Sequence, residues 1–205
     1  RLFTHECHRV YADRLVTEAE VEMFTDVFNE IVTSSLVGPS IAAEDLFEPN
    51  NVFTNFATSS DGSYLPIPSM EKLKAVIDSK LVEYNECNAI MDLVLFKQAI
   101  LHIVRINRII QNPGGNAMLV GVGGSGKQSL CRLAAFISGY EVRQISVTSG
   151  YGVEDLKDEL RSIYRTAGVR GNPIVFLMTD TQIVNEKFLV YINGILTSGW
   201  IPDLF

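Results

Sequence analysis

Apolar residues in the first 34 positions recur at intervals of three and four, the spacing that places side chains on one face of a helix. Phe3, Cys7 and Val10 share one such face, which predicts a first helix. Thr17 and Glu20 fit a capping box, because the hydroxyl can accept from the third amide while the carboxylate bonds back. A second helix is therefore expected from this point. Its apolar stripe consists of Val21, Phe24, Phe28, Ile31 and Val32.

Residues 38–69 interrupt this periodicity with a polar run over 58–63 and with four prolines, namely Pro39, Pro49, Pro66 and Pro68. Proline and short polar residues break regular structure. We therefore interpret this range as a linker or surface crossing between two packed units.

From residue 70 onward helical spacing resumes, and after residue 116 it alternates with short apolar runs. The helical patterns cover 70–81, 96–110, 127–137, 153–163 and 188–196. The short runs, which are typical of buried strands, cover 117–120, 141–147 and 174–178. Alternating strands and helices predict an α/β fold, in which a parallel sheet is covered on both faces.

Composition narrows the class of protein. Of the 205 residues, 47% are hydrophobic and 20% are charged, so a packed core is expected and global disorder is not. The net charge of −7, without a basic stripe, argues against a general nucleic-acid partner. Three scattered cysteines indicate no disulfide framework and fit a reducing compartment. No apolar run is long enough to span a bilayer, and no signal peptide is visible, so no membrane partner is expected.

The segment from Gly121 to Lys127 has the pattern G-x₄-G-K of a phosphate-binding P-loop, between a predicted strand and a predicted helix. Glycines let successive backbone N–H groups turn toward phosphate oxygens, and the helix N-terminus adds partial positive charge. The alternative is a glycine-rich turn with an exposed lysine. The predicted phosphate-binding residues are Gly121, Gly123, Gly124, Ser125, Gly126, Lys127, Gln128 and Ser129.

The residue after the P-loop lysine departs from the rule. A hydroxyl that ligates Mg²⁺ is expected there, and the chain has Gln128. An amide oxygen can ligate a hard cation, but it is longer and differently placed. Ser129 faces about 100° further round the helix and is a poor substitute.

A P-loop ATPase also needs acids at the end of a neighbouring strand. After 174–178 the chain has Thr179 and Asp180, a single acid where a pair is usual. Asp180 is a candidate catalytic residue, or with Gln128 a candidate Mg²⁺ ligand; the alternative is that it caps a helix. As the catalytic acid, Asp180 is one methylene shorter than the usual Glu, and a misplacement of about 1 Å can cost ~100-fold in rate. As a metal ligand, it would leave no acid to polarise the attacking water. Hydrolysis is therefore handicapped in either role.

These motifs resemble the fourth AAA+ module of an axonemal dynein heavy chain. The likeness rests on 116–130, on 176–182, including Gln128 and the Thr179–Asp180 pair, and on the lead-in stretches 84–86 and 91–96. Residues 1–15 are similar to the helical lid that ends the third module. The resemblance covers nearly the whole chain and is weakest over 36–64. An outer-arm heavy chain is the preferred subclass.

The resemblance implies a P-loop AAA+ large subdomain, truncated, preceded by an α-helical lid segment. Residues 1–37 would be the end of the lid, 38–69 a linker, and 70–205 the N-terminal part of the large subdomain. Five strands are usual in this subdomain, so further strands are expected after Phe205. The chain also opens within a helical pattern and without Met, and we therefore expect a piece of a longer protein.

The same resemblance implies a regulatory site for ATP or ADP, with Mg²⁺ as a candidate metal. It implies a minus-end-directed microtubule motor that drives ciliary beating in the axoneme and is assembled in the cytoplasm. The implied partners are neighbouring AAA+ modules of the same chain, microtubules through a stalk, and intermediate and light chains through a tail. The alternatives are a structural ring segment without nucleotide, or an autonomous P-loop ATPase.

Other candidate residues follow from the same comparison or from local patterns. The resemblance places the adenine beside the segment before the helix at 96–110, so its candidate residues are Leu93, Val94, Leu95 and Phe96, with ordinary core positions as the alternative. Arg9 could reach a neighbouring module's nucleotide, although an exposed or salt-bridged helix arginine is the preferred interpretation. The run from His5 to His8 invites a zinc interpretation, which the i, i+3 spacing and the lack of a third ligand disfavour.

Overall fold

The computed structural model describes residues 1–38, 42, 46, 51–59 and 61–205. It divides into two compact units, Arg1–Val76 and Ile77–Phe205, and the division falls inside one helix, α4 (Met70–Cys87). Pro39, Pro49 and most of residues 39–50 in the predicted linker lie outside the described residues. In the described part of the chain, no helix is both long and apolar enough to cross a membrane.

The first unit contains α1 (Leu2–Tyr11), a 3₁₀ turn η1 (Ala12–Arg14) and α2 (Glu18–Leu36). The predicted capping box is confirmed, since Glu20 N donates to Thr17 Oγ1 and Thr17 N donates to Glu20 Oε2. Phe28 and Val32 of the predicted stripe are buried. The His8 ring packs edge-on against the rings of Phe24 and Phe28, which joins α1 to α2.

A short antiparallel hairpin lies within the range predicted to be linker. Its strands are β1 (Phe53–Thr54) and β2 (Leu65–Pro66), and both β1 residues are buried. His5 connects α1 to this region, because its Nδ1 lies 2.9 Å from Asn51 O and its Nε2 lies 2.7 Å from the Tyr64 hydroxyl. The segment is therefore partly packed against α1.

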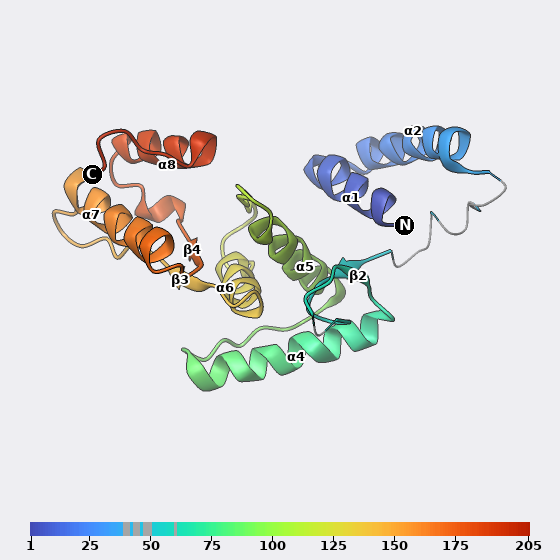
Figure 1. Cartoon of the computed structure of the whole chain (residues 1–205), viewed down its shortest axis with the longest axis horizontal. Coiled ribbons are helices and arrows are strands. Elements are labelled where there is room, and N and C mark those ends of the chain that lie inside the picture. The colour runs from blue at the N-terminus through green and yellow to red at the C-terminus, as the bar shows by residue number, and fades with distance from the viewer. Residues whose placement is uncertain (39–41, 43–45, 47–50, 60) are drawn as a thin grey trace. The chain divides into compact units, whose positions relative to one another are not determined.

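The second unit begins with the C-terminal part of α4, followed by α5 (Lys97–Gln111) and α6 (Lys127–Ile137). α5 packs on α6, and α6 contacts the sheet (Figure 1). The buried Asn107 of α5 donates to Oγ of Ser138, the C-cap residue of α6, at 2.8 Å. The apolar residues that α5 and α6 bury include Ala99, Ile100, Ile103, Leu130, Leu133 and Ala134.

Two strands form the parallel sheet of this unit, β3 (Glu141–Arg143) and β4 (Ile174–Phe176), paired with Glu141 opposite Ile174. α7 (Val153–Tyr164) and a π-helical turn η2 (Arg165–Val169) connect them, and a 3₁₀ turn η3 (Asp180–Gln182) and α8 (Lys187–Ser198) follow. The prediction of parallel strands joined through helices is confirmed here. The core around α7 and α8 contains Ile145, Leu156, Leu160, Phe188, Ile201 and Leu204.

One predicted strand is wrong in the described structure. Residues 117–120 form no ladder with another described segment, and Met118 and Val120 are 90% and 85% exposed. A buried strand needs neighbours that satisfy its backbone groups and cover its side chains. β3 and β4 pair with each other, and neither strand pairs with 117–120.

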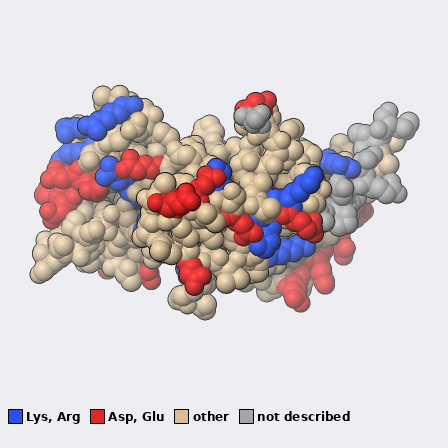
Figure 2. Space-filling model, turned by 90° about the horizontal axis from the view of Figure 1, so that it is seen from below, with Lys and Arg blue, Asp and Glu red and all other residues tan. Residues whose placement is uncertain are grey.

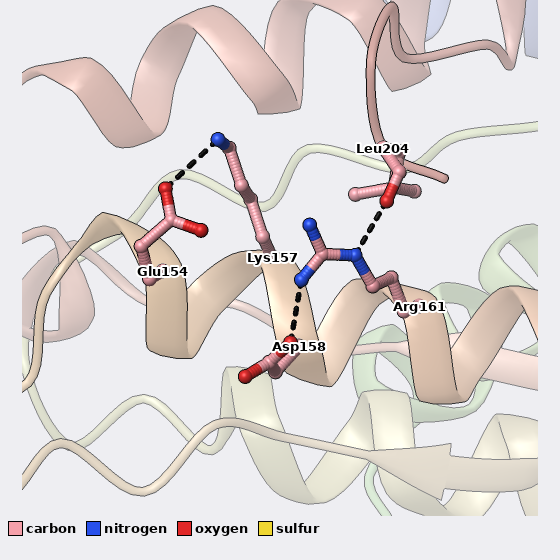
Figure 3. Close-up of polar contacts among 5 residues, drawn as sticks. All are labelled: Glu154, Lys157, Asp158, Arg161 and Leu204. Atoms are coloured by element: carbon pink, nitrogen blue, oxygen red, sulfur yellow. Dashed lines mark hydrogen bonds and ion pairs between the residues drawn. The ribbon is translucent and has the colours of Figure 1, made fainter.

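The segment after α8 is fastened to one face of α7 (Figure 3). Arg161 Nε donates to Leu204 O at 2.5 Å, and the Tyr164 hydroxyl donates to Gly199 O at 2.8 Å. On the same helix, Lys157 and Arg161 form ion pairs with Glu154 and Asp158. Ile201 and Leu204 of this segment are buried in the core around α7 and α8.

Candidate functional site

The P-loop candidate forms a glycine-dependent turn that leads directly into α6. Gly124 and Gly126 both have φ of +76°, a left-handed conformation that is costly for other residues. Gly126 is the N-cap of α6, so the helix begins at Lys127, as its sequence pattern predicts. The two glycines therefore turn the chain sharply just before α6 begins.

Lys127 places its ammonium group over this turn. Its Nζ lies 2.8 Å from Gly121 O, 2.7 Å from Val122 O and 3.1 Å from Ser125 Oγ. These are charge-assisted hydrogen bonds, and all of them are made within the loop. The positive charge is thereby held at the loop rather than extended into solvent.

The N-terminus of α6 adds further donors. No side chain caps it, and its first turn contains no acidic residue. The first N–H groups of a helix have no partner within the helix, and the helix dipole gives this end a partial positive charge. Together with Lys127, this end of α6 has the donor set that phosphate oxygens need.

Space beside the ammonium depends on Gly121. A Cβ at this position would lie 3.5 Å from Ser125 Oγ and 3.8 Å from Lys127 Nζ. A side chain there would occupy the interior of the loop next to the positive charge. The residues present therefore fit a nucleotide phosphate, with Gly121 and Gly126 shaping the loop and Lys127 supplying the charge.

The four predicted adenine-side residues have different environments. Leu93 approaches the loop, since its Cδ1 lies 3.6 Å from the position that a Cβ on Gly126 would take. Leu95 is buried in the core, as the alternative interpretation had it. Val94 and Phe96 are 76% and 61% exposed. The structure thus brings one of the four, Leu93, to the P-loop.

The two positions after Lys127 are both neutral. The Gln128 side chain is exposed on the first turn of α6, and Ser129 is half-buried. Neither is a carboxylate, and Mg²⁺ in proteins is usually held by one or two carboxylates together with substrate phosphates. A role for Gln128 as a metal ligand therefore stays a prediction.

The second half of the predicted site follows β4. The alternative in which Asp180 caps a helix is wrong: Thr179 is the N-cap of η3, and its N–H donates to Gln182 Oε1 at 2.9 Å. Asp180 is exposed, and its Oδ1 accepts a hydrogen bond from Thr181 N at 3.0 Å. Because 117–120 does not pair with β4 in the described structure, a common site for Asp180 and the loop stays a prediction.

A role for one residue near this turn, Gln182, was not predicted from the sequence. Gln182 is buried, and its Nε2 donates to Ile145 O at 2.5 Å, which fastens η3 to the segment after β3. Little in the sequence indicates that Gln182 is buried, since a single amide side chain after Thr181 is typical of a surface turn. Its role is to position the turn that contains Thr179 and Asp180.

The side chains in the zinc-like run have other partners. Both ring nitrogens of His5 contact protein groups, and His8 packs between aromatic rings of α2. Arg9 donates to Glu6 Oε2 at 2.7 Å, which confirms the interpretation as a salt-bridged helix arginine. Among the described residues, no group of three or more His, Cys, Asp or Glu side chains is placed to hold a metal ion.

Charge on the exposed surface has no dominant sign on the face in view. Figure 2 shows acidic and basic side chains interspersed among neutral ones on this face. A nucleic-acid interface would need clustered Lys and Arg side chains. The concentrated positive character of the site is instead local, at Lys127 and the N-terminus of α6.

Comparison with known proteins assigns the region. Residues 91–205 match the family model described as the P-loop containing dynein motor region D4. Over its whole length the chain is 51% identical to the flagellar outer arm dynein beta chain of Chlamydomonas reinhardtii and 48% identical to human dynein axonemal heavy chain 17. It is 47% identical to the ciliary dynein beta chain of Tripneustes gratilla. The chain spans about 5% of the length of each of these relatives.

Proposed function

Because this chain belongs to the axonemal dynein heavy chain family, we propose that its loop at Gly121–Lys127 binds ATP or ADP as a regulatory site. The single observation that carries the proposal is the position of Lys127. Its ammonium lies on a left-handed glycine turn at an uncapped helix N-terminus. Anionic phosphate oxygens are the ligands that such an arrangement favours.

A regulatory rather than a hydrolytic role follows from the residues around the loop. Gln128 stands where a metal-binding hydroxyl is usual, and Thr179 stands where an acid is usual. Asp180 is the remaining acid of that turn. Bound nucleotide would then persist, and its presence would set the conformation of the module.

The wider role of the protein is proposed from its family. We infer that residues 1–37 end the helical lid of the third AAA+ module and that 70–205 begin the large subdomain of the fourth. The whole heavy chain would be a minus-end-directed microtubule motor in the ciliary axoneme, assembled in the cytoplasm. Its partners would be the neighbouring AAA+ modules, microtubules, and intermediate and light chains.

Photolabelling can test binding and hydrolysis at this site within the full-length heavy chain. 8-Azido-ATP labelled at the α- or the γ-phosphate would be bound, allowed to react for increasing times and then crosslinked. The tryptic peptide 81–97 contains Leu93, Val94, Leu95 and Phe96, so its label reports on this site.

We expect both labels to persist on this peptide, because weak hydrolysis leaves the γ-phosphate in place. Loss of the γ-label at the rate of ordinary AAA+ turnover, with the α-label retained, would show an active ATPase instead. The third possibility, a structural ring segment without nucleotide, predicts no specific label in residues 70–205.

A further inference from the structure

The positions that usually hold Mg²⁺ depart from the P-loop pattern, whereas the glycines and Lys127 that contact phosphate follow it. The first of these departures is Gln128. In P-loop enzymes the hydroxyl after the lysine ligates Mg²⁺. Mg²⁺ demands near-octahedral oxygen ligands at roughly 2.0–2.1 Å. A glutamine places its oxygen two bonds further from the backbone than a serine does, and the Gln128 side chain is exposed. The first metal ligand of the usual site is therefore replaced by a group that fits poorly.

The turn after β4 does not compensate for this change. The Thr179 hydroxyl lies 3.0 Å from the Thr181 hydroxyl, and its backbone N–H is bonded to Gln182. The Asp180 carboxylate accepts from Thr181 N within the same turn. One of the two carboxylate oxygens is thereby held within the turn, and Asp180 is the single acid of this turn. The turn is thus organised around its own hydrogen bonds.

Fixed protein groups supply positive character without a metal. The Lys127 ammonium is anchored by three acceptors within 3.1 Å, and the first turn of α6 contains no acidic residue. These groups can neutralise the phosphates next to the loop. A γ-phosphate adds negative charge that Mg²⁺ normally helps to neutralise, so a site without the metal favours the diphosphate.

We infer that this site, if it binds nucleotide as proposed above, does so independently of Mg²⁺ and prefers ADP to ATP. Gln128 and Thr179 are the residues that determine this property. The inference concerns the response of binding to the metal, and it can fail while nucleotide binding itself is confirmed.

The test compares labelling by 8-azido-ADP and 8-azido-ATP on peptide 81–97 of the full-length heavy chain, in Mg²⁺ and in excess EDTA. The apparent affinity for the ADP probe should differ by less than about threefold between the two conditions, that is by under ~0.7 kcal/mol. The ATP probe should bind more weakly than the ADP probe in both.

The matched variant restores both metal-side groups as Gln128→Thr with Thr179→Asp. Mg²⁺ should strengthen binding of the ATP probe to this variant by about tenfold or more, since a phosphate-bridging metal would now have protein ligands. Binding of the ADP probe in EDTA, close to that of the natural chain, would show that the variant is folded.

Two outcomes overturn the inference and are distinguishable from failure of the proposed function. If EDTA weakens ADP binding to the natural chain by tenfold or more, the site depends on Mg²⁺ although it binds nucleotide. If the double variant binds but gains no response to Mg²⁺, residues 128 and 179 do not determine the property. Absence of label under every condition would instead refute the proposed nucleotide site itself.

Discussion

Single residues determine the shape of the candidate site. Gly126 turns the chain at the start of α6, and Lys127 returns its ammonium to the carbonyl groups of Gly121 and Val122. The loop therefore combines a strained turn that only glycine adopts cheaply with a charge held in place by local hydrogen bonds. Substitutions here should separate the contribution of the backbone from that of the charge.

Gly126→Ala should destabilise the chain through its backbone. At φ of +76° an alanine Cβ costs roughly 1–2 kcal/mol, whereas its nearest neighbour, Leu93 Cδ1, lies at an ordinary contact distance of 3.6 Å. Urea unfolding of the 205-residue chain measures the difference. Gly123→Ala is the control, since a Cβ there meets nothing within 4 Å, and it should leave stability nearly unchanged. Equal stability of the two variants would contradict this account.

His8 should make the first unit less stable in mild acid. Burial against Phe24 and Phe28 lowers the pKa of its imidazole, although Asp13 opposes the shift. The unfolded chain, with an ordinary pKa of about 6.5, then binds more protons than the folded chain. Stability is complete above about pH 6.5 and falls as the pH drops toward the lowered folded pKa. An NMR titration of the His8 ring should give a midpoint below 6.5, and a midpoint above it would contradict the assignment.

Elements of the second unit are joined by side chains on one face of α7. Lys157, Arg161 and Tyr164 lie about one turn apart on this helix. Arg161 donates to Leu204 O (Figure 3), and the Tyr164 hydroxyl donates to Gly199 O. Lys157 also lies over the Tyr191 ring of α8. The returning segment 199–205 therefore depends on α7 for its position.

Arg161→Ala should release this segment. The variant loses a hydrogen bond from a charged donor to Leu204 O, an interaction that contributes roughly 1.5–3 kcal/mol. Hydrogen exchange followed by mass spectrometry should show faster exchange over 199–205. The matched control is Glu154→Gln, which breaks the exposed ion pair with Lys157, and it should leave that exchange unchanged. Unaltered exchange in Arg161→Ala would show that other contacts hold the segment.

How well each element could be predicted depended on how local its determinants are. The bounds of α6 and the capping box of α2 were predicted because glycine, threonine and glutamate act within a few residues. Residues 117–120 were predicted to be a buried strand and are not, because pairing depends on distant segments that no local pattern reveals. The hairpin β1–β2 was missed because each strand has only two residues.

The candidate site was predictable to a similar degree. The loop residues were predicted, since their spacing is itself the signal. The three acceptors of Lys127 and the bond from Gln182 to Ile145 O could not be, because they depend on rotamers and on the packing of separate segments.

At the scale of the whole molecule, these 205 residues correspond to about 5% of each relative. The relatives are axonemal and flagellar dynein heavy chains, and the family model assigns 91–205 to motor region D4. The proposed site would act within that larger chain by retaining nucleotide. That proposal depends first on whether the loop binds nucleotide through Lys127.

Photolabelling of the full-length heavy chain with 8-azido-ADP, compared between Lys127→Ala and Lys187→Ala, tests this central claim most directly. Lys127 is the first residue of α6 and Lys187 the first residue of α8, so each variant removes a lysine side chain at the same position of a helix. The account predicts that the natural chain and Lys187→Ala acquire label within residues 70–205 and that Lys127→Ala loses it. Labelling that survives in Lys127→Ala, or that never appears in this range, would contradict it.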